Sequence, residues 1–475
     1  MDLNKHDIKR FLVKSSDLTR KKLFVEFYQP KSQFLFKKLH ECPYPLHSLK
    51  ELSNRMFDGP FGSNRKVDMY QDNGIIPYIR VKDVLPSGIF LDELKYISQE
   101  KHNELIRSRV VPGNLLITIA GRLGTAAVFP ESLKEGNITG HIVGLELSKE
   151  INPHYVATFI NSQLGQFQAI RLGHRTTRPE LNLSEVGEFV IPVPPRPVQD
   201  LIAQIMQDAY VVRHKKLAQA EYIDLHISDF VLERLRINYI EVENAKYFCI
   251  SIKELLSSRF DIKYQSPKAK NALFLLDKSE YSIKSLGDLI EEIHYGASVK
   301  NDYADDGIPF IRIGNLKPNY LDVSDIVYFD ESKRNLLGKA FVKPEDLLMS
   351  RSGSVGIVAV VTSEANGFAF GSFQIKFRLF KNSANPFFIA YFLNSKIGKA
   401  LLEQQKTGSI QMNITIEGIK AIKVPLPAIE IQNQIVREAD EQRTQATFLR
   451  NESEDTLLTA KARVERIILG EEDVT

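Results

Sequence analysis

The sequence has few of the residues that would build a metal or cofactor site. It holds two cysteines in 475 residues, Cys42 and Cys249, too far apart in the chain to suggest shared ligation. Such isolated cysteines fit a reduced cytosol. The ten histidines stand singly, without the His-x-x-x-His or His-Glu-x-x-His spacing of a zinc site. We therefore expect no metal and no cofactor.

Long apolar runs and catalytic loops are also missing. No apolar run approaches the roughly 18 residues of a membrane-spanning helix, and the first ten residues, MDLNKHDIKR, lack the apolar core of a signal peptide. No glycine-rich turn leads into Gly-Lys-Ser/Thr, and the acidic Pro344-Glu345-Asp346 lacks the lysine that a nuclease site would need. We expect a cytoplasmic chain that makes no membrane contact and is not itself an enzyme.

Composition leaves the partner open. The charged fraction of 25% and the hydrophobic fraction of 43% are ordinary for a soluble globular protein, and the length allows two or more domains. The net charge is only +3, so bulk charge does not favour nucleic acid. Any DNA binding must therefore rest on local patches.

Two long helices are predicted, over residues 198–235 and 431–469. Apolar or small residues recur there at steps of three and four, which is typical of a helix with one apolar face. At about 1.5 Å per residue, the first would be on the order of 55 Å long. Two ordinary amphipathic helices in separate cores would explain the pattern, but the length and repetition of the two stretches favour a paired coiled coil.

The chain is an internal repeat. Ile76–Val81 (IPYIRV) matches Ile308–Ile313 (IPFIRI) at a spacing of 232 residues, and Gly121 and Gly124 fall on Gly353 and Gly356 at the same spacing. Gln199 and Gln432, at the starts of the two helices, correspond at 233. Each half should hold a globular domain followed by a long helix.

Six segments follow from this repeat. They are an N-terminal lead-in (1–45), a first domain (46–197), a central long helix (198–235), a linker and second lead-in (236–280), a second domain (281–430) and a distal long helix (431–469). Short β-rich runs mixed with helical ones predict α+β domains with irregular sheets. One helix is expected at about 153–170, with Asn152 as N-cap and Pro153 as its first residue.

Four duplicated blocks carry a family resemblance. They are the IPYIR/IPFIR strand, the PGNLLITIAGRLG/PEDLLMSRSGSVG turn, the NPHYVATFINS/NPFFIAYFLNS helix start and the IPVPP/VPLP strand before each long helix. In this order, twice, they resemble the DNA specificity subunit of type I restriction–modification systems. The likeness covers nearly the whole chain.

The resemblance implies a fold of class α+β: two tandem α/β target-recognition domains separated by two long antiparallel coiled-coil helices, with a pseudo-two-fold internal repeat. It implies a non-catalytic protein that reads a bipartite, asymmetric sequence in double-stranded DNA. It also implies two methyltransferase subunits and two restriction subunits as partners. The duplicated sequence agrees with this, because two like domains can meet two DNA sites while their differences make the target asymmetric.

The candidate DNA-binding residues lie in three places of each half. The residues after the shared strand are Arg80, Lys82, Arg312 and Asn315, and the glycine turns supply Arg122, Arg351, Ser352 and Ser354. The loops before the last strand supply Arg175, Thr176, Thr177, Arg178, Ser409, Gln411 and Asn413. Such side chains can hold phosphates or base edges, but a tight turn or a solvated loop would also explain each place.

Three functional alternatives remain. Asn152-Pro153 and Asn385-Pro386 resemble the start of an adenine-methyltransferase motif, but the second proline is absent, so helix capping is the better interpretation. Besides the DNA specificity subunit, the chain would fit a non-DNA-binding assembly scaffold. It would also fit the recognition subunit of a methylation-only or other restriction system.

Overall fold

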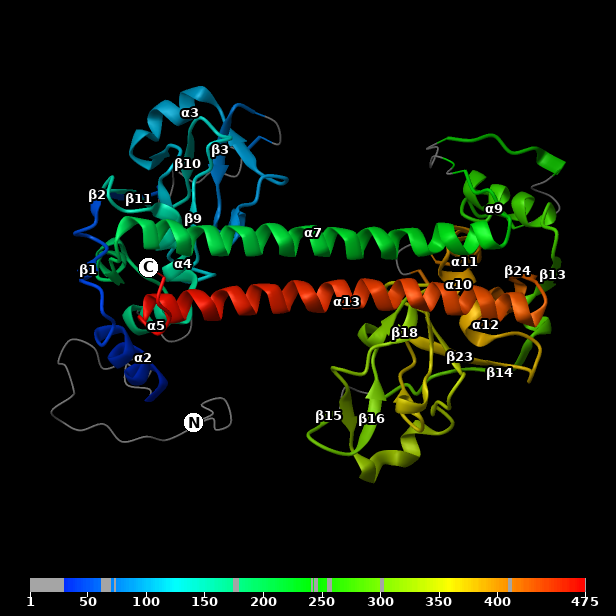
Figure 1. Cartoon of the computed structure of the whole chain (residues 1–475). Coiled ribbons are helices and arrows are strands. Elements are labelled where there is room, and N and C mark those ends of the chain that lie inside the picture. Colours follow the sequence, from blue (N-terminus) through cyan, green and yellow to red (C-terminus); the bar gives the residue numbers. More distant parts are fainter. Residues whose placement is uncertain are drawn as a thin grey trace. The chain divides into compact units, whose positions relative to one another are not determined.

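The computed structural model describes residues 30–60, 70–71, 74–173, 179–240, 242, 247–253, 259–299, 303–408 and 412–474. The chain forms two compact units, residues 1–216 with 451–475, and residues 217–450. The long helices α7 (Arg196–Arg234) and α13 (Ile429–Ile468) each contribute a part to both units (Figure 1). They begin two residues earlier than predicted from the apolar pattern.

The first unit contains two four-stranded sheets, of order β2-β11-β8-β9 and β6-β3-β10-β7. The strands are β2 (Ser53–Asp58), β3 (Ile76–Ile79), β6 (Lys95–Ile97), β7 (Arg109–Val110), β8 (Leu115–Thr118), β9 (Ala126–Val128), β10 (Gly136–Ile138) and β11 (Ile142–Leu147). Two short pairs accompany them: β1 (Leu46–Ser48) with β12 (Val190–Pro192), and β4 (Val84–Leu85) with β5 (Gly88–Ile89). The helices are α2 (Pro30–His40), α3 (Gln99–Glu104), α4 (Pro153–Asn161), α5 (Gln163–Leu172) and α6 (Leu183–Gly187).

The second unit repeats this arrangement with a six-stranded sheet, β14-β23-β20-β21-β18-β17, and a four-stranded one, β15-β19-β16-β22. Its strands are β13 (Ser282–Ser285), β14 (Ile290–Tyr295), β15 (Tyr303–Ala304), β16 (Ile308–Ile311), β17 (Leu316–Lys317), β18 (Asn319–Leu321), β19 (Val327–Phe329), β20 (Leu347–Ser350), β21 (Val358–Val360), β22 (Ala369–Phe370), β23 (Gln374–Leu379) and β24 (Lys423–Leu426), with β13 pairing β24. The helices are α9 (Pro267–Asp277), α10 (Pro386–Asn394), α11 (Lys396–Gln405) and α12 (Ile416–Ala421).

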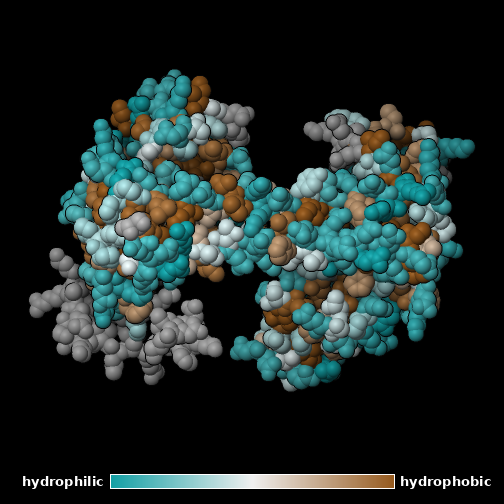
Figure 2. All heavy atoms as spheres, viewed as in Figure 1, coloured by the Kyte–Doolittle hydropathy of each residue, from teal (hydrophilic) through white to brown (hydrophobic). Residues whose placement is uncertain are grey.

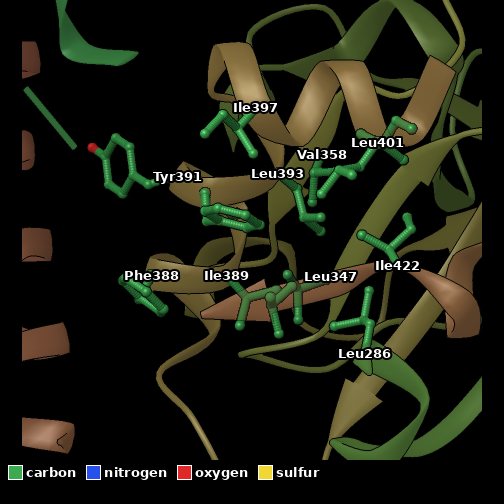
Figure 3. Packing of buried hydrophobic residues seen from close by; sticks show 14 of the residues in the cluster. Leu286, Leu347, Val358, Phe388, Ile389, Tyr391, Leu393, Ile397, Leu401 and Ile422 are labelled. Carbon is green, nitrogen blue, oxygen red and sulfur yellow. The ribbon is translucent and has the colours of Figure 1, made fainter. Parts of the chain in front are cut away.

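Strand β20 shows why an uninterrupted apolar run forms a strand here. Its side chains alternate between two cores: Leu347 and Met349 pack with the helices, and Leu348 packs with the other sheet. Strand β8 does the same with Leu115–Thr118 in the first unit. Because both faces are covered, every position is apolar or small. Figure 3 shows Leu347 beside Ile389 in the helix-side core of the second unit.

The helix predicted over about 153–170 is two helices. Asn152 caps α4 as predicted, with its side chain accepting from the backbone N–H of His154 at 2.8 Å. The chain then breaks at Ser162, whose backbone is extended and whose hydroxyl accepts from Gly165 N. A Cβ on Gly165 would lie 2.4 Å from the Ile160 backbone, so only glycine allows this tight start of α5. Ser395 and Gly398 repeat the break in the second unit.

Within each unit the two long helices pack side by side and run antiparallel. In the first unit Arg213 pairs with Glu454 at 2.7 Å and Lys216 with Glu452 at 3.4 Å. In the second, Arg234 pairs with Glu438 at 2.6 Å. As the residue numbers rise along α7, those of the ion-pair partners in α13 fall, so the two helices run antiparallel. None of the helices in the described ranges is long and apolar enough to cross a membrane.

Candidate nucleic-acid interface

A buried glutamine joins each domain to its long helix. Gln199 is 2% exposed, accepts from Asn152 N at 2.9 Å and donates to the Pro194 carbonyl at 2.9 Å. Gln432 makes the matching bonds to Asn385 N and to the Pro427 carbonyl. Both side chains satisfy backbone groups that would otherwise be buried without partners. The proline-rich strand end, the capped helix and the long helix therefore form one rigid support in each unit.

The arginines after the shared strand hold tight 3-10 turns. Arg80 donates to both carboxylate oxygens of Asp83 at 2.9 Å and to the Glu93 carbonyl at 2.6 Å, before the turn η4 (Val81–Asp83). Before η7 (Ile313–Asn315), Arg312 likewise donates to the Asp325 carbonyl at 2.8 Å, and it also donates to the Asp325 carboxylate at 2.7 Å. Both guanidinium groups stabilise the fold through these hydrogen bonds, and each is partly exposed to solvent beside its turn.

The structure changes how Asn315 and Lys82 are understood. Both residues follow the shared strand, but the structural counterpart of Asn315 is Asp83, since each accepts from the backbone N–H of the arginine three residues earlier, at 2.8 to 2.9 Å. Asn315 is buried, and its amide also donates to two carbonyls. It therefore cannot reach a base edge. Lys82 is exposed and pairs with Glu93 at 2.7 Å.

The glycine turns lie against these 3-10 turns. In the first unit, a Cβ on Gly121 would be 3.6 Å from the Val81 side chain. In the second, a Cβ on Gly353 would be 3.7 Å from Ile313. Gly121 and Gly353 have φ of +75° and +71°, a region that favours glycine. Two of the three predicted places thus come together in each unit.

In the first unit the third predicted place, the loop before the last strand, begins next to the glycine turn. A Cβ on Gly173 would lie 3.4 Å from Leu123 of the glycine turn. The residues that follow, Arg175, Thr176, Thr177 and Arg178, fall outside the described residues, as do Ser409 and Gln411. Asn413 is described, half-buried, and its backbone bridges to Thr407 at 2.8 and 2.9 Å.

The arginines of the glycine turns, unlike Arg80 and Arg312, form no ion pair with a described residue. Arg122 is exposed, and its side chain makes no ion pair or hydrogen bond to any described residue. Arg351 lies over the Tyr295 ring at 4.5 Å, and its Nε is buried without a hydrogen-bond partner in the described part of the chain. Ser354 is exposed, whereas Ser352 is 4% exposed and cannot act as a surface contact.

Sequence reasoning missed Tyr295 and Phe373, which neighbour Arg351. Tyr295 ends β14 opposite Ile375, and the Phe373 carbonyl accepts from Arg351 N at 2.8 Å. Their exposed fractions, 38% and 58%, are high for aromatic side chains. A signal existed for Phe373, which corresponds to His141 at the repeat spacing, but only the strand ladder places Tyr295 near Arg351.

Each unit also has a cleft next to the end of its first long strand. In the first it is lined by Asp58–Pro60 and by Glu104, Leu105, Arg107 and Ser108, and measures about 360 Å³. In the second it is lined by residues from Glu292 to Ala297 and by Leu337, Lys339 and Ala340, also about 360 Å³. No group of three or more histidine, cysteine or acidic side chains suited to a metal occurs among the residues described.

Comparison with known proteins identifies the family. Residues 62–221 and 278–440 each match the type I restriction modification DNA specificity domain. The chain belongs to this family. The two matches lie one in each half, which confirms the tandem repeat read from the sequence.

Individual relatives are more distant. The chain is 25% identical over 162 residues to a putative type I restriction enzyme MjaX specificity subunit of Methanocaldococcus jannaschii, covering 33% of this chain and 38% of the relative. It is 20% identical over 268 residues to the type I restriction enzyme EcoBI specificity subunit of Escherichia coli, covering 56% of this chain and 54% of the relative. The chain thus spans about half or less of these curated relatives.

A solved structure shares the fold. A chain from a structure described as the basis of complex assembly and conformational transition of the type I R-M system aligns with a TM-score of 0.53 at 16% identity. The alignment covers 90% of this chain and 97% of the other. The mixed helix-and-strand class with two long helices, predicted from the sequence, is confirmed.

Proposed function

We propose that this protein is the non-catalytic specificity subunit of a type I restriction–modification complex, with each unit binding one half of a bipartite DNA target. The observation that carries the proposal is the duplicated meeting of a 3-10 turn with a glycine turn, at Val81 and Gly121 and again at Ile313 and Gly353. The supporting backbone is the same in both units and the outward side chains differ. That combination suits two readers of different half-sites.

Charge and polarity at these turns fit a duplex better than a protein partner. Arg122 is exposed without an ion pair to the described residues, and Lys82 is exposed on η4, where it pairs with Glu93. The space-filling view in Figure 2 shows hydrophobic residues grouped in several patches among hydrophilic ones. Arginine and lysine at a backbone turn are suited to phosphates, with base contacts adding sequence preference.

The partners belong to the same proposal. Two methyltransferase subunits and two restriction subunits would assemble on this chain, which would act in the cytoplasm. A methylation-only complex would need the first pair alone.

The test is a mobility shift with random duplexes, using the chain alone and together with a methyltransferase subunit. Binding should weaken steeply with salt, because phosphate contacts release counterions. Lys82→Ala, at an exposed predicted contact, should reduce the slope of log affinity against log salt by about 1, because a phosphate contact is lost. Lys399→Ala, an exposed lysine on α11, serves as the control.

The assembly scaffold is the competing function. It predicts that the chain retains the methyltransferase in a pull-down while no duplex shifts in either sample. That outcome would reject DNA recognition.

A further inference from the structure

The two glycine turns are built on one backbone pattern. Ile119 N donates to the His141 carbonyl at 2.9 Å, and Arg351 N donates to the Phe373 carbonyl at 2.8 Å. The flanking ladders match as well, since Thr118 faces Ile142 in the first unit and Ser350 faces Gln374 in the second. Residues 119 and 141 therefore occupy the same structural positions as 351 and 373.

Two more positions complete the set. In the ladder of the first unit Val143 faces Asp58, and in the second Ile375 faces Tyr295. Across the turn, the hydroxyl of Thr118 donates to the Arg122 carbonyl and that of Ser350 to the Ser354 carbonyl. The first reader set is thus Asp58, Ile119, Arg122 and His141, and the second reader set is Tyr295, Arg351, Ser354 and Phe373.

The two reader sets carry their arginine at different positions. The first has its arginine on the turn, at 122, and a buried Ile119 at the strand end. The second has a serine on the turn, at 354, and its arginine at the strand end, at 351. The aromatic partner of that arginine, Tyr295, is replaced in the first set by Asp58, which lies 3.9 Å from Arg107.

Stacking on Tyr295 gives Arg351 a property that a free surface arginine lacks. A guanidinium held over a ring keeps its plane and direction, so fewer rotamers are lost when its terminal N–H groups bind. Its buried Nε has no partner among the described residues, and such groups in a folded protein call for an explanation. A planar, directed donor pair matches the O6 and N7 acceptors of guanine.

We propose that these two reader sets determine base preference, with Arg351 on Tyr295 selecting a guanine in one half-site and Arg122 with His141 reading the other. The inference rests on the DNA-binding function proposed above. Exposed Phe373 adds an apolar surface beside Arg351, of the kind that packs on a thymine methyl group or a sugar.

The experiment is selection from a duplex library with a randomised central segment, using the complex with its methyltransferase. Wild type is compared with Arg351→Lys, Tyr295→Leu and Arg122→Ser. Arg334→Ala is the matched control, because Arg334 also lies over an aromatic ring, that of Phe341 at 5.1 Å, but outside both reader sets. Melting curves check that each variant is folded.

Arg351→Lys keeps the charge and loses the planar donor pair. It should reduce the preference for one base about tenfold in one half of the enriched motif, leaving the other half unchanged. Tyr295→Leu should act on the same half. Arg122→Ser should act only on the opposite half, and Arg334→Ala on neither.

Two results would count against the inference, and they are separable. If wild type enriches a split motif and all variants enrich the same one with only weaker total binding, the reader sets hold phosphates or structure and the inference is wrong. If wild type enriches no motif, DNA recognition itself fails and the inference with it. A variant that flattens both halves would also overturn the assignment of one set to one half.

Discussion

The sheets of the two units place different chemistry at one equivalent position. In the first, Gly144 lies under the Phe57 ring, so close that a Cβ would be 2.6 Å from it. In the second, Lys376 and His294 face each other there, and Lys376 is buried with ion pairs at 3.5 Å to Asp346 and Glu292. The same fold is thus stabilised by apolar packing in one unit and by a buried charge network in the other.

The comparison separates two kinds of residue in the repeat. Side chains that satisfy the backbone, such as Gln199 and Gln432, keep their identity in both units. Some side chains with no such role have diverged, as at Gly144 and Lys376 in the sheets and at Arg122 and Ser354 on the glycine turns. Exposed positions where the backbone is the same but the side chains differ between the units therefore indicate DNA recognition better than the shared motifs do.

The largest effect is expected from breaking the charge network of the second unit. Asp346→Asn keeps the hydrogen bond to Lys343 N but removes the carboxylate from buried Lys376 and from Arg378, which lies at 2.5 Å. Leaving a buried cation less compensated should destabilise this unit by about 3 kcal/mol. Amide hydrogen exchange would show the loss in peptides of residues 217–450, with exposed Asp305→Asn as a control.

A smaller loss of stability, equal in the two units, is expected when either of the shared glutamines is replaced. Gln199→Ala and Gln432→Ala each leave one buried N–H and one carbonyl without partners, which should cost about 2 kcal/mol in the unit concerned. Hydrogen exchange near α4 and α10 measures both. Gln204→Ala, an exposed residue of α7, should change little. Unequal losses would mean that the two junctions are not equivalent.

A methyl group added at Gly144 tests the apolar packing that stabilises the sheet of the first unit. Gly144→Ala forces the Cβ against the Phe57 ring and should destabilise the first unit by about 1.5 kcal/mol. Gly314→Ala is the control, because nothing lies within 4 Å of the added Cβ. Unchanged exchange in peptides of β2 and β11 would show that the ring moves aside freely.

The smallest effect concerns pH. Burial by itself would raise the pKa of Glu292, but the neighbouring side chains of Lys376, His294 and Arg378 outweigh it, so this pKa lies below its ordinary value. A carboxyl whose folded pKa is lowered contributes stability above its unfolded pKa and loses it as pH falls through the folded value. Glu292→Gln should therefore be less stable than wild type at neutral pH, and the gap in melting temperature should close on acidification.

The repeat, the family and the main elements were predictable because they rest on local signals. Asn152-Pro153 announces a helix start by itself, and the apolar spacing of the long helices is visible over their whole length. The break at Ser162 was not predicted, because it depends on Gly165 fitting against the Ile160 backbone. That close approach has no pattern in the sequence.

The candidate site was predictable only in part for a similar reason. The turns of Arg122 and Arg351 were predictable because each arginine lies within two residues of a glycine in the chain. The stacking of Arg351 on Tyr295 depends on strand register, which joins residues far apart in sequence. Burial likewise removed Ser352 and Asn315 from the surface, and a one-dimensional pattern does not record burial.

Methylation mapping of the source genome, with this gene intact and deleted, tests the central claim most directly. Two units that read different half-sites predict one split, asymmetric, adenine-containing motif that is modified in the intact strain and unmodified after deletion. A motif that survives the deletion, or one that is contiguous or palindromic, would contradict it.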